Sequence, residues 1–102
     1  MGRKRDRLKI IYDILKVIQD RNNRILHTHI LYKANLSYPI LQNYLQELIF
    51  KDLVKKYPIK NKHVYGLTDK GFEYLHKYNL VKDFTTLFDL EANESRATEM
   101  DS

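Results

Sequence analysis

Residues 28–71, THILYKANLSYPILQNYLQELIFKDLVKKYPIKNKHVYGLTDKG, decide the fold of this chain. The stretch begins with a short helical segment over residues 29–34, and Asn35-Leu36-Ser37 forms a turn. A second helix opens on Ser37, a good N-cap, and Pro39 lies in its first turn, where a missing N–H costs nothing. The pattern therefore predicts two helices joined by a tight turn.

The second half of this stretch predicts a hairpin and a third helix. The helix that opens on Ser37 extends to about Lys51, with Leu41, Leu45, Leu48 and Ile49 at helical spacing. Two strand-like runs follow at residues 53–57 and 63–67, joined by the loop Pro58-Ile59-Lys60-Asn61-Lys62. Thr68 can cap a further helix, and Asp69 is placed favourably near the positive end of that helix.

An amphipathic helix precedes this stretch, over residues 6–20. Its apolar side chains recur at steps of three and four, namely Leu8, Ile11, Ile14, Leu15 and Ile18. Asn22-Asn23 ends it, because asparagine favours turns and tolerates left-handed backbone. Arg24-Ile25-Leu26 is a short extended piece that we expect to pair with the hairpin as a third strand.

Charge is distributed unevenly along the 102 residues. Residues 1–82 hold 17 Lys/Arg against 7 Asp/Glu, a net charge of +10, whereas residues 83–102 hold 1 against 6, a net charge of −5. A compact basic module points to a polyanionic partner, and nucleic acid is the partner we expect. The alternative is that the charge only keeps the surface soluble.

An ordered set of motifs resembles the small archaeal winged-helix proteins. The set comprises Ala34-Asn35-Leu36-Ser37-Tyr38, then Leu41, Tyr44-Leu45, Leu48 and Leu53-Val54, and finally Tyr65-Gly66-Leu67-Thr68-Asp69-Lys70-Gly71. The match covers roughly residues 5 to 80. Many relatives place glycine before the leucine-valine pair, where this chain has Asp52.

The resemblance implies a fold and a function. The fold is mainly α with a small β-hairpin wing, a winged helix-turn-helix followed by a C-terminal dimerisation helix. The function is that of a DNA-binding transcription regulator or small chromatin protein, often a homodimer. We assign residues 1–79 to the DNA-binding domain with its basic arm, residues 80–91 to the dimerisation helix and residues 92–102 to a disordered acidic tail.

The helix from about residue 38 to 51 carries the expected base contacts. If its leucines face the core, helical geometry turns Pro39, Gln42, Asn43 and Gln46 outward. Asn and Gln can form bidentate hydrogen bonds with adenine edges in the major groove of double-stranded DNA. Ser37 and Tyr38, at the start of the helix, are placed to bond phosphate, although helical phase puts Tyr38 near the core side.

Basic residues elsewhere are expected to contact the DNA backbone. Those of the hairpin are Lys55, Lys60, Lys62 and His63, beside which Lys56 also lies. Lysine in such a wing supplies affinity that does not depend on sequence, through counterion release. The N-terminal arm, with Arg3, Lys4 and Arg5, either does the same, reaches into a minor groove, or forms a disordered tail.

The apolar residues after Asn79 are expected to join two copies of the chain. They fall on one stripe of a helix: Leu80, Val81, Phe84, Leu87 and Phe88. A domain of about 80 residues whose core is already filled has little room to cover such a stripe. The alternative is that the helix folds back over the first helix of its own chain.

Other classes of function are disfavoured. The chain has no cysteine, and His27 and His29 have no third ligand nearby, so we expect no metal site and no other cofactor. No apolar run approaches the roughly 18 residues of a membrane span, so we expect a cytoplasmic protein. There is no glycine-rich phosphate loop and no paired nucleophile and base, so we do not expect an enzyme, and no small-molecule ligand is evident.

The alternative function is a winged-helix protein–protein adaptor in transcription or replication machinery.

Overall fold

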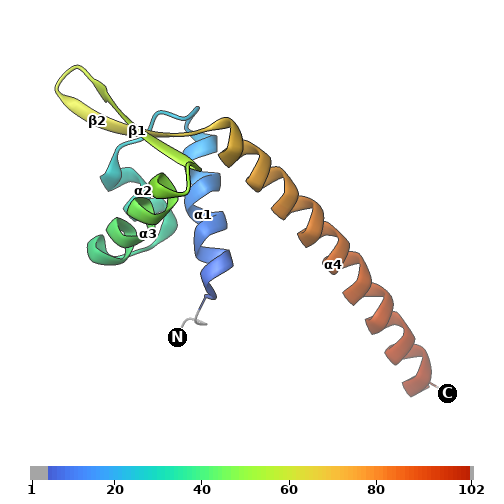
Figure 1. The fold of residues 1–102 in the computed structure, drawn as a ribbon. Helices are drawn as coiled ribbons and strands as arrows, with labels where there is room; N and C mark the ends of the chain where they lie inside the picture. Colours follow the sequence, from blue (N-terminus) through green and yellow to red (C-terminus); the bar gives the residue numbers. More distant parts are fainter. Residues whose placement is uncertain (1–4, 102) are drawn as a thin grey trace.

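The computed structural model describes the backbone of residues 5–101 and the side chains of residues 5–85 and Leu87. In chain order its elements are α1 (Arg7–Asp20), α2 (His27–Ala34), α3 (Tyr38–Phe50), β1 (Val54–Ile59), β2 (Lys62–Leu67) and α4 (Asp69–Asp101), as Figure 1 shows. This is the predicted arrangement of helices and a two-stranded hairpin. The positions of Arg3 and Lys4 and the side chain of Phe88 lie outside the described residues.

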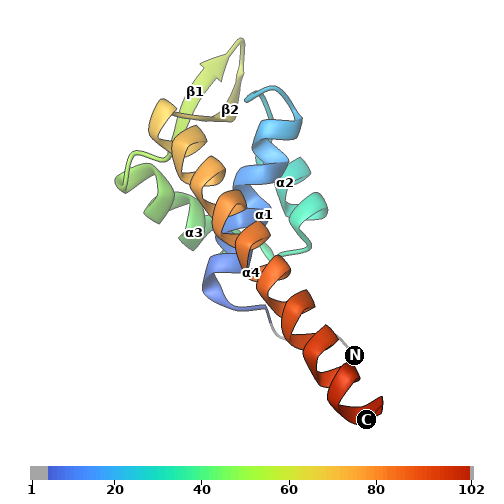
Figure 2. The same cartoon turned by 90° about the vertical axis from the view of Figure 1, so that its right-hand side faces the viewer.

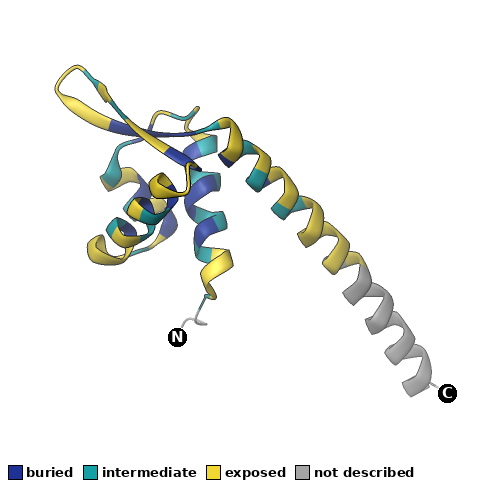
Figure 3. Ribbon diagram, viewed as in Figure 1, coloured by how far each residue is buried: buried dark blue, intermediate teal, exposed yellow. Residues whose placement is uncertain are grey.

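The core lies between the three short helices and the base of the hairpin (Figure 3). Most of the leucines and isoleucines that the sequence predicts in the apolar rows of α1 and α3 are buried, and Leu75 of α4 closes one side, but Leu8 and Ile49 are 54% and 38% exposed. Burial of each such side chain stabilises the fold by roughly 1.5–3 kcal/mol. Because Leu41, Leu45 and Leu48 are 0–1% exposed, the rotation of α3 about its axis is fixed. The opposite side of α3 must therefore face solvent.

The hairpin is antiparallel, with a shorter turn than the sequence predicts. Val54 pairs with Leu67 at its base and Ile59 with Lys62 at its tip, so Pro58 belongs to β1 rather than to the loop. The edge position suits Pro58, which has no N–H to donate. The expected third strand is reduced to a single bridge: the N–H of Tyr65 donates to the carbonyl of Ile25 at 2.9 Å.

The Thr68-Asp69-Lys70-Gly71 motif ties the start of α4 to the end of α3. The hydroxyl of Thr68 accepts a hydrogen bond from the N–H of Gly71 at 2.9 Å, as the predicted cap should, and donates to the carbonyl of Asp52 at 2.6 Å. The ammonium of Lys70 donates to the carbonyl of Lys51 at 3.1 Å. The direction in which α4 leaves the body is therefore set by α3.

The C-terminal part differs from the sequence prediction. Instead of a separate helix at residues 80–91 and a disordered segment at 92–102, α4 continues from Asp69 to Asp101. No glycine or proline occurs after Gly71, and residues 91–100 include the good helix formers Glu, Ala, Arg and Met. Figures 1 and 2 show α4 leaving the body on the side away from the hairpin tip. Within the described residues, no helix combines the length and the apolar character that a bilayer span requires.

Candidate nucleic-acid interface

The outer face of α3 presents most of the polar residues that the sequence predicts there. Pro39, Asn43 and Gln46 are exposed, and Gln42 is half-buried. Ile40, which the sequence reasoning did not select, is also 46% exposed on this helix. Its position outside the row of buried leucines was the signal that could have identified it. The face therefore combines amide groups with one apolar side chain.

The first turn of α3 is open to solvent. Ser37 occupies the N-cap position with extended backbone, but among the described residues its side chain makes no capping hydrogen bond. Tyr38 is 60% exposed, although helical phase places it near the core side. The reason is that its ring packs on the imidazole of His27, with centroids 4.6 Å apart, rather than beneath the helix.

His27 packs against the first turn of α3 through the ring of Tyr38. Both ring nitrogens are buried and have no hydrogen-bond partner within the described part of the chain. Desolvation by burial lowers the pKa of His27; the nearby Gln42 side chain, which does not reach hydrogen-bond geometry, partly opposes this shift, and the charge of Lys56 adds to it. His27 and His29 both lie in α2, and no group of three or more potential metal ligands gathers among the described residues.

The hairpin presents its basic side chains to solvent. Lys55, Lys60, Lys62 and His63 are all exposed, as is Lys56. Lys60 adopts the left-handed backbone with φ 54°, which tightens the turn at the tip. The hairpin thus carries a concentration of positive charge beside the fold's second and third helices (Figure 1).

The one arm residue that the structure describes, Arg5, is held by the body of the protein. Its guanidinium forms an ion pair with Asp13 at 2.7 Å and donates to the carbonyl of Asn35 at 3.0 Å. Arg7, the next arginine, forms an ion pair with Glu47 of α3. Arg5 therefore lies against α1 and the end of α2, with part of its charge balanced.

The apolar stripe on α4 that we expect to join two copies of the chain is exposed to solvent along its described length. Leu80, Val81, Phe84 and Leu87 are 56%, 65%, 71% and 63% exposed. Between this part of α4 and the start of α1 lies a shallow groove of about 300 Å³, lined in part by Leu8, Tyr78 and Val81. Within the described residues the stripe is not folded back over α1, as the alternative prediction would require.

Comparisons with known proteins agree on the fold. A family model described as a winged helix-turn-helix matches residues 4–86. An uncharacterized protein of Methanocaldococcus jannaschii, MJ0290, is 36% identical over 74 residues, which are 72% of this chain and 32% of that protein. The chain thus spans about a third of the length of this curated relative.

Solved structures with the same architecture include three from different sources. Sso10a-2, a DNA-binding protein from Sulfolobus solfataricus, has a TM-score of 0.71 at 22% identity, over 90% of this chain and 95% of that one. F93 from STIV, a winged-helix DNA-binding protein, has a TM-score of 0.63 at 23% identity, over 76% and 90%. MepR, a transcription regulator of Staphylococcus aureus, has a TM-score of 0.69 at 18% identity, over 89% and 73%. At these identities the likeness is one of fold.

Proposed function

The chain belongs to the winged helix-turn-helix family, and we propose that it binds double-stranded DNA as a transcription regulator or small chromatin protein. One observation carries the proposal: the exposed polar side chains of α3 are neutral amides, its one acidic residue, Glu47, is half-buried and paired with Arg7 and Lys51, and the hairpin beside α3 is lined with lysine. An acidic or mainly apolar face on α3 would have favoured a protein partner instead. Two proteins of similar fold, Sso10a-2 and F93, are DNA-binding proteins.

In this proposal α3 enters the major groove. Asn43 and Gln46 offer the paired donor and acceptor that match an adenine edge, and Gln42 does so from a more restricted position. Ile40 adds an apolar surface of the kind that contacts a thymine methyl group. Ser37 and Tyr38, with the free backbone N–H groups of the first turn, hold phosphate at the positive end of the helix dipole. Pro39 packs beside them as part of the same contact.

The hairpin rests on the neighbouring backbone. Lys55, Lys60, Lys62 and His63 supply contacts to phosphate that do not distinguish sequence. The arm residues Arg3 and Lys4 are proposed to add backbone contacts of the same kind, whereas Arg5 contributes less because Asp13 already balances its charge. Affinity therefore comes mainly from the hairpin and the arm, and selectivity from α3.

We also propose that two copies associate through α4. Leaving four large apolar side chains in water is unfavourable, since burial of each is worth roughly 1.5–3 kcal/mol. Packing the stripe of Leu80, Val81, Phe84, Leu87 and Phe88 against its two-fold copy removes it from water. The two α3 helices then read half-sites related by the same two-fold axis.

A protein partner is the second candidate. Tyr32 and Phe50 are 80% and 89% exposed, and neither belongs to the stripe on α4 or to the proposed base-reading set on α3. Exposed aromatic side chains are enriched where proteins contact one another. This observation favours an adaptor role in addition to DNA binding.

A mobility-shift titration with random duplex DNA, repeated at low and moderate salt, tests the proposal. Each phosphate neutralised contributes about 0.9 to the slope of the logarithm of affinity against that of salt concentration. Contacts from the hairpin alone should therefore give a steep loss of affinity. An affinity that hardly changes with salt would contradict DNA binding by this surface.

A further inference from the structure

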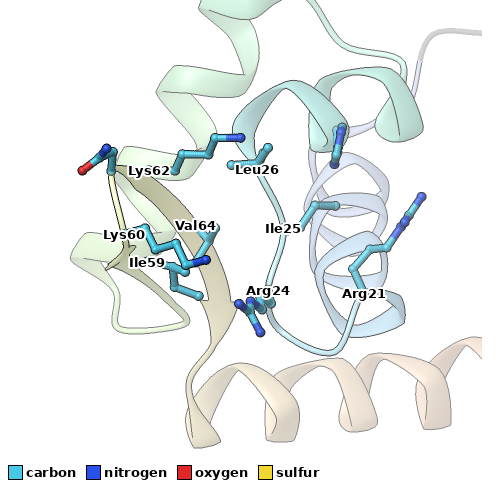
Figure 4. A pocket seen from close by; sticks show the side chains of 10 residues that line it. Arg21, Arg24, Ile25, Leu26, Ile59, Lys60, Lys62 and Val64 are labelled. Carbon is cyan, nitrogen blue, oxygen red and sulfur yellow. The ribbon is translucent and has the colours of Figure 1, made fainter.

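A pocket of about 540 Å³ separates the hairpin tip from the body of the protein (Figure 4). One wall is the hairpin, with Ile59, Lys60, Asn61, Lys62 and Val64. The other wall is the turn between α1 and α2 and the first part of α2, with Arg21, Arg24, Ile25, Leu26 and His29. The lining comes from two segments at least thirty positions apart, so the sequence alone did not indicate it.

The lining combines a cationic rim with an apolar floor. Its charged residues are Arg21, Arg24, Lys60 and Lys62, and within the described part of the chain none of the four forms an ion pair. No Asp or Glu occurs among the ten described lining residues. Figure 4 shows Lys60 and Lys62 reaching from the hairpin toward the opposite wall. Four isoleucine, leucine and valine side chains complete the pocket.

Hydrogen bonds join the base of the hairpin to the body of the protein beside the pocket, whereas the other wall of the pocket is the tip of the hairpin. The hydroxyl of Tyr57 donates to the carbonyl of Asn23 at 2.6 Å, and the N–H of Leu67 donates to the Asn23 side chain at 3.3 Å. The bridge between Ile25 and Tyr65 adds a third attachment. All three lie on one side of the pocket, so a molecule within it would connect the hairpin tip to the body.

We propose that this pocket binds a small amphipathic organic anion, a carboxylate or sulfonate carried on an aromatic or branched aliphatic body. The acidic group meets the arginines and lysines of the rim, where charge-assisted hydrogen bonds are strongest. The apolar body lies on Ile25, Leu26 and Val64, and the volume is within the range of small-molecule sites. A phosphate of the DNA backbone has no apolar part with which to fill such a floor.

Occupancy of the pocket should weaken DNA binding, an extension that rests on the proposed function. Lys60 and Lys62 belong both to the pocket rim and to the proposed backbone contact. An anion held between them neutralises charge that the DNA backbone would otherwise use. Because such coupling is reciprocal, DNA should weaken binding of the anion by the same factor.

Titration of the full chain with 2-naphthoate, followed by ¹⁵N–¹H NMR and calorimetry, tests the site without DNA. We expect saturable shifts at the amides of residues 24–29 and 59–64. The neutral isostere 2-naphthamide should bind about tenfold or more weakly, because it lacks the charge that the rim recognises. Inorganic phosphate should shift only amides of the hairpin tip and should not saturate.

The variant Arg21→Gln/Arg24→Gln should weaken 2-naphthoate binding about tenfold or more. It leaves the proposed DNA-contacting residues intact. Lys33→Gln/Lys77→Gln removes the same formal charge from exposed positions outside the pocket and should leave naphthoate affinity unchanged. Equal losses in the two double variants, or binding of naphthoate only along the stripe on α4, would overturn the inference.

Mobility-shift titrations with and without 2-naphthoate separate this inference from the proposed function. The anion should lower DNA affinity of the wild-type chain and have little effect on Arg21→Gln/Arg24→Gln. DNA binding without any saturable naphthoate site would contradict the pocket alone. A saturable site in a protein that does not bind DNA would support the pocket and contradict the proposed function.

Discussion

A side chain at Gly71 would collide with the backbone of Leu53: a Cβ atom built there lies 2.1 Å from the Leu53 carbonyl oxygen. The obstacle is backbone and cannot move aside as a side chain can. Gly71→Ala should therefore lower the free energy of unfolding by about 2–3 kcal/mol, measured by urea denaturation. Glu73→Ala, on the exposed side of the same helix, is the control. A change in stability no larger than that of the control would refute this contact.

Asp52 follows α3 in the left-handed conformation, with φ 61°. Glycine suits this position because it adopts left-handed backbone without steric cost, so the glycine of many relatives is the expected residue and Asp52 is the departure. Asp52→Gly should raise the free energy of unfolding by up to about 1 kcal/mol, since glycine adopts this backbone without steric cost. Asp52→Val should lower it, because a branched side chain is poorly tolerated there. The melting temperature, measured by thermal denaturation, should be higher than that of the wild type for Asp52→Gly and lower for Asp52→Val.

Base selectivity should reside in α3 and general affinity in the hairpin. Asn43→Ala should cost roughly 1–3 kcal/mol on a preferred site, selected from a random library, and little on random DNA. Lys60→Ala/Lys62→Ala should weaken binding to the preferred site and to random DNA alike. It should also reduce the slope of the logarithm of affinity against that of salt concentration. If Asn43→Ala instead reduces affinity equally for both DNAs, α3 does not read bases.

Phe84→Asp should convert a dimer into a monomer. Phe84 is 71% exposed at the centre of the described stripe, and a buried carboxylate there would face its own copy across the two-fold axis. The mass from sedimentation should halve and DNA affinity should fall. Asn79→Asp adds the same charge on the side of α4 turned away from Phe84, by helical geometry, and should remain dimeric. A wild-type chain that sediments as a monomer at tens of micromolar would remove the dimer proposal.

His27 should make stability depend on pH. Because desolvation lowers its pKa below the ordinary value of 6.5, the unfolded chain binds a proton that the folded chain resists. The stabilisation is therefore fully present above the unfolded pKa and is lost as pH falls toward the lowered folded-state pKa. His27→Phe should flatten this part of the curve of unfolding free energy against pH, whereas His63→Gln, at an exposed site, should not. Identical curves for wild type and His27→Phe would disprove the effect.

The parts of the fold that the sequence predicted well are those with local causes. The leucines of α3 repeat at helical spacing, so the orientation of the whole helix follows from three residues. Thr68 was predicted as a cap because a hydroxyl at that position satisfies a nearby N–H. In both cases the decisive contacts lie within a few positions along the chain.

The features that the sequence did not predict depend on contacts between distant segments. Tyr38 is exposed because His27, eleven positions earlier, lies beneath its ring. Gln42 was predicted on the outer face, but it is half-buried beside the same histidine. The pocket under the hairpin requires the tip to stand over the turn after α1, which no local pattern encodes. The roles of individual residues in DNA contact remain predictions.

The uninterrupted course of α4 has a consequence for the spacing of half-sites. In a dimer joined through the stripe, each residue between Gly71 and Leu80 advances the body by about 1.5 Å and rotates it by about 100° around the helix axis. Because both copies would carry it, a one-residue insertion there would rotate each reading head by about 100° around its own helix, so that the pair would no longer present the two α3 helices to the same side of a duplex. An insertion of seven residues would restore the facing and move each head by about 10 Å. In the proposed dimer the helix would act as a phase-setting spacer, and operator length could change only in steps of nearly whole helical repeats.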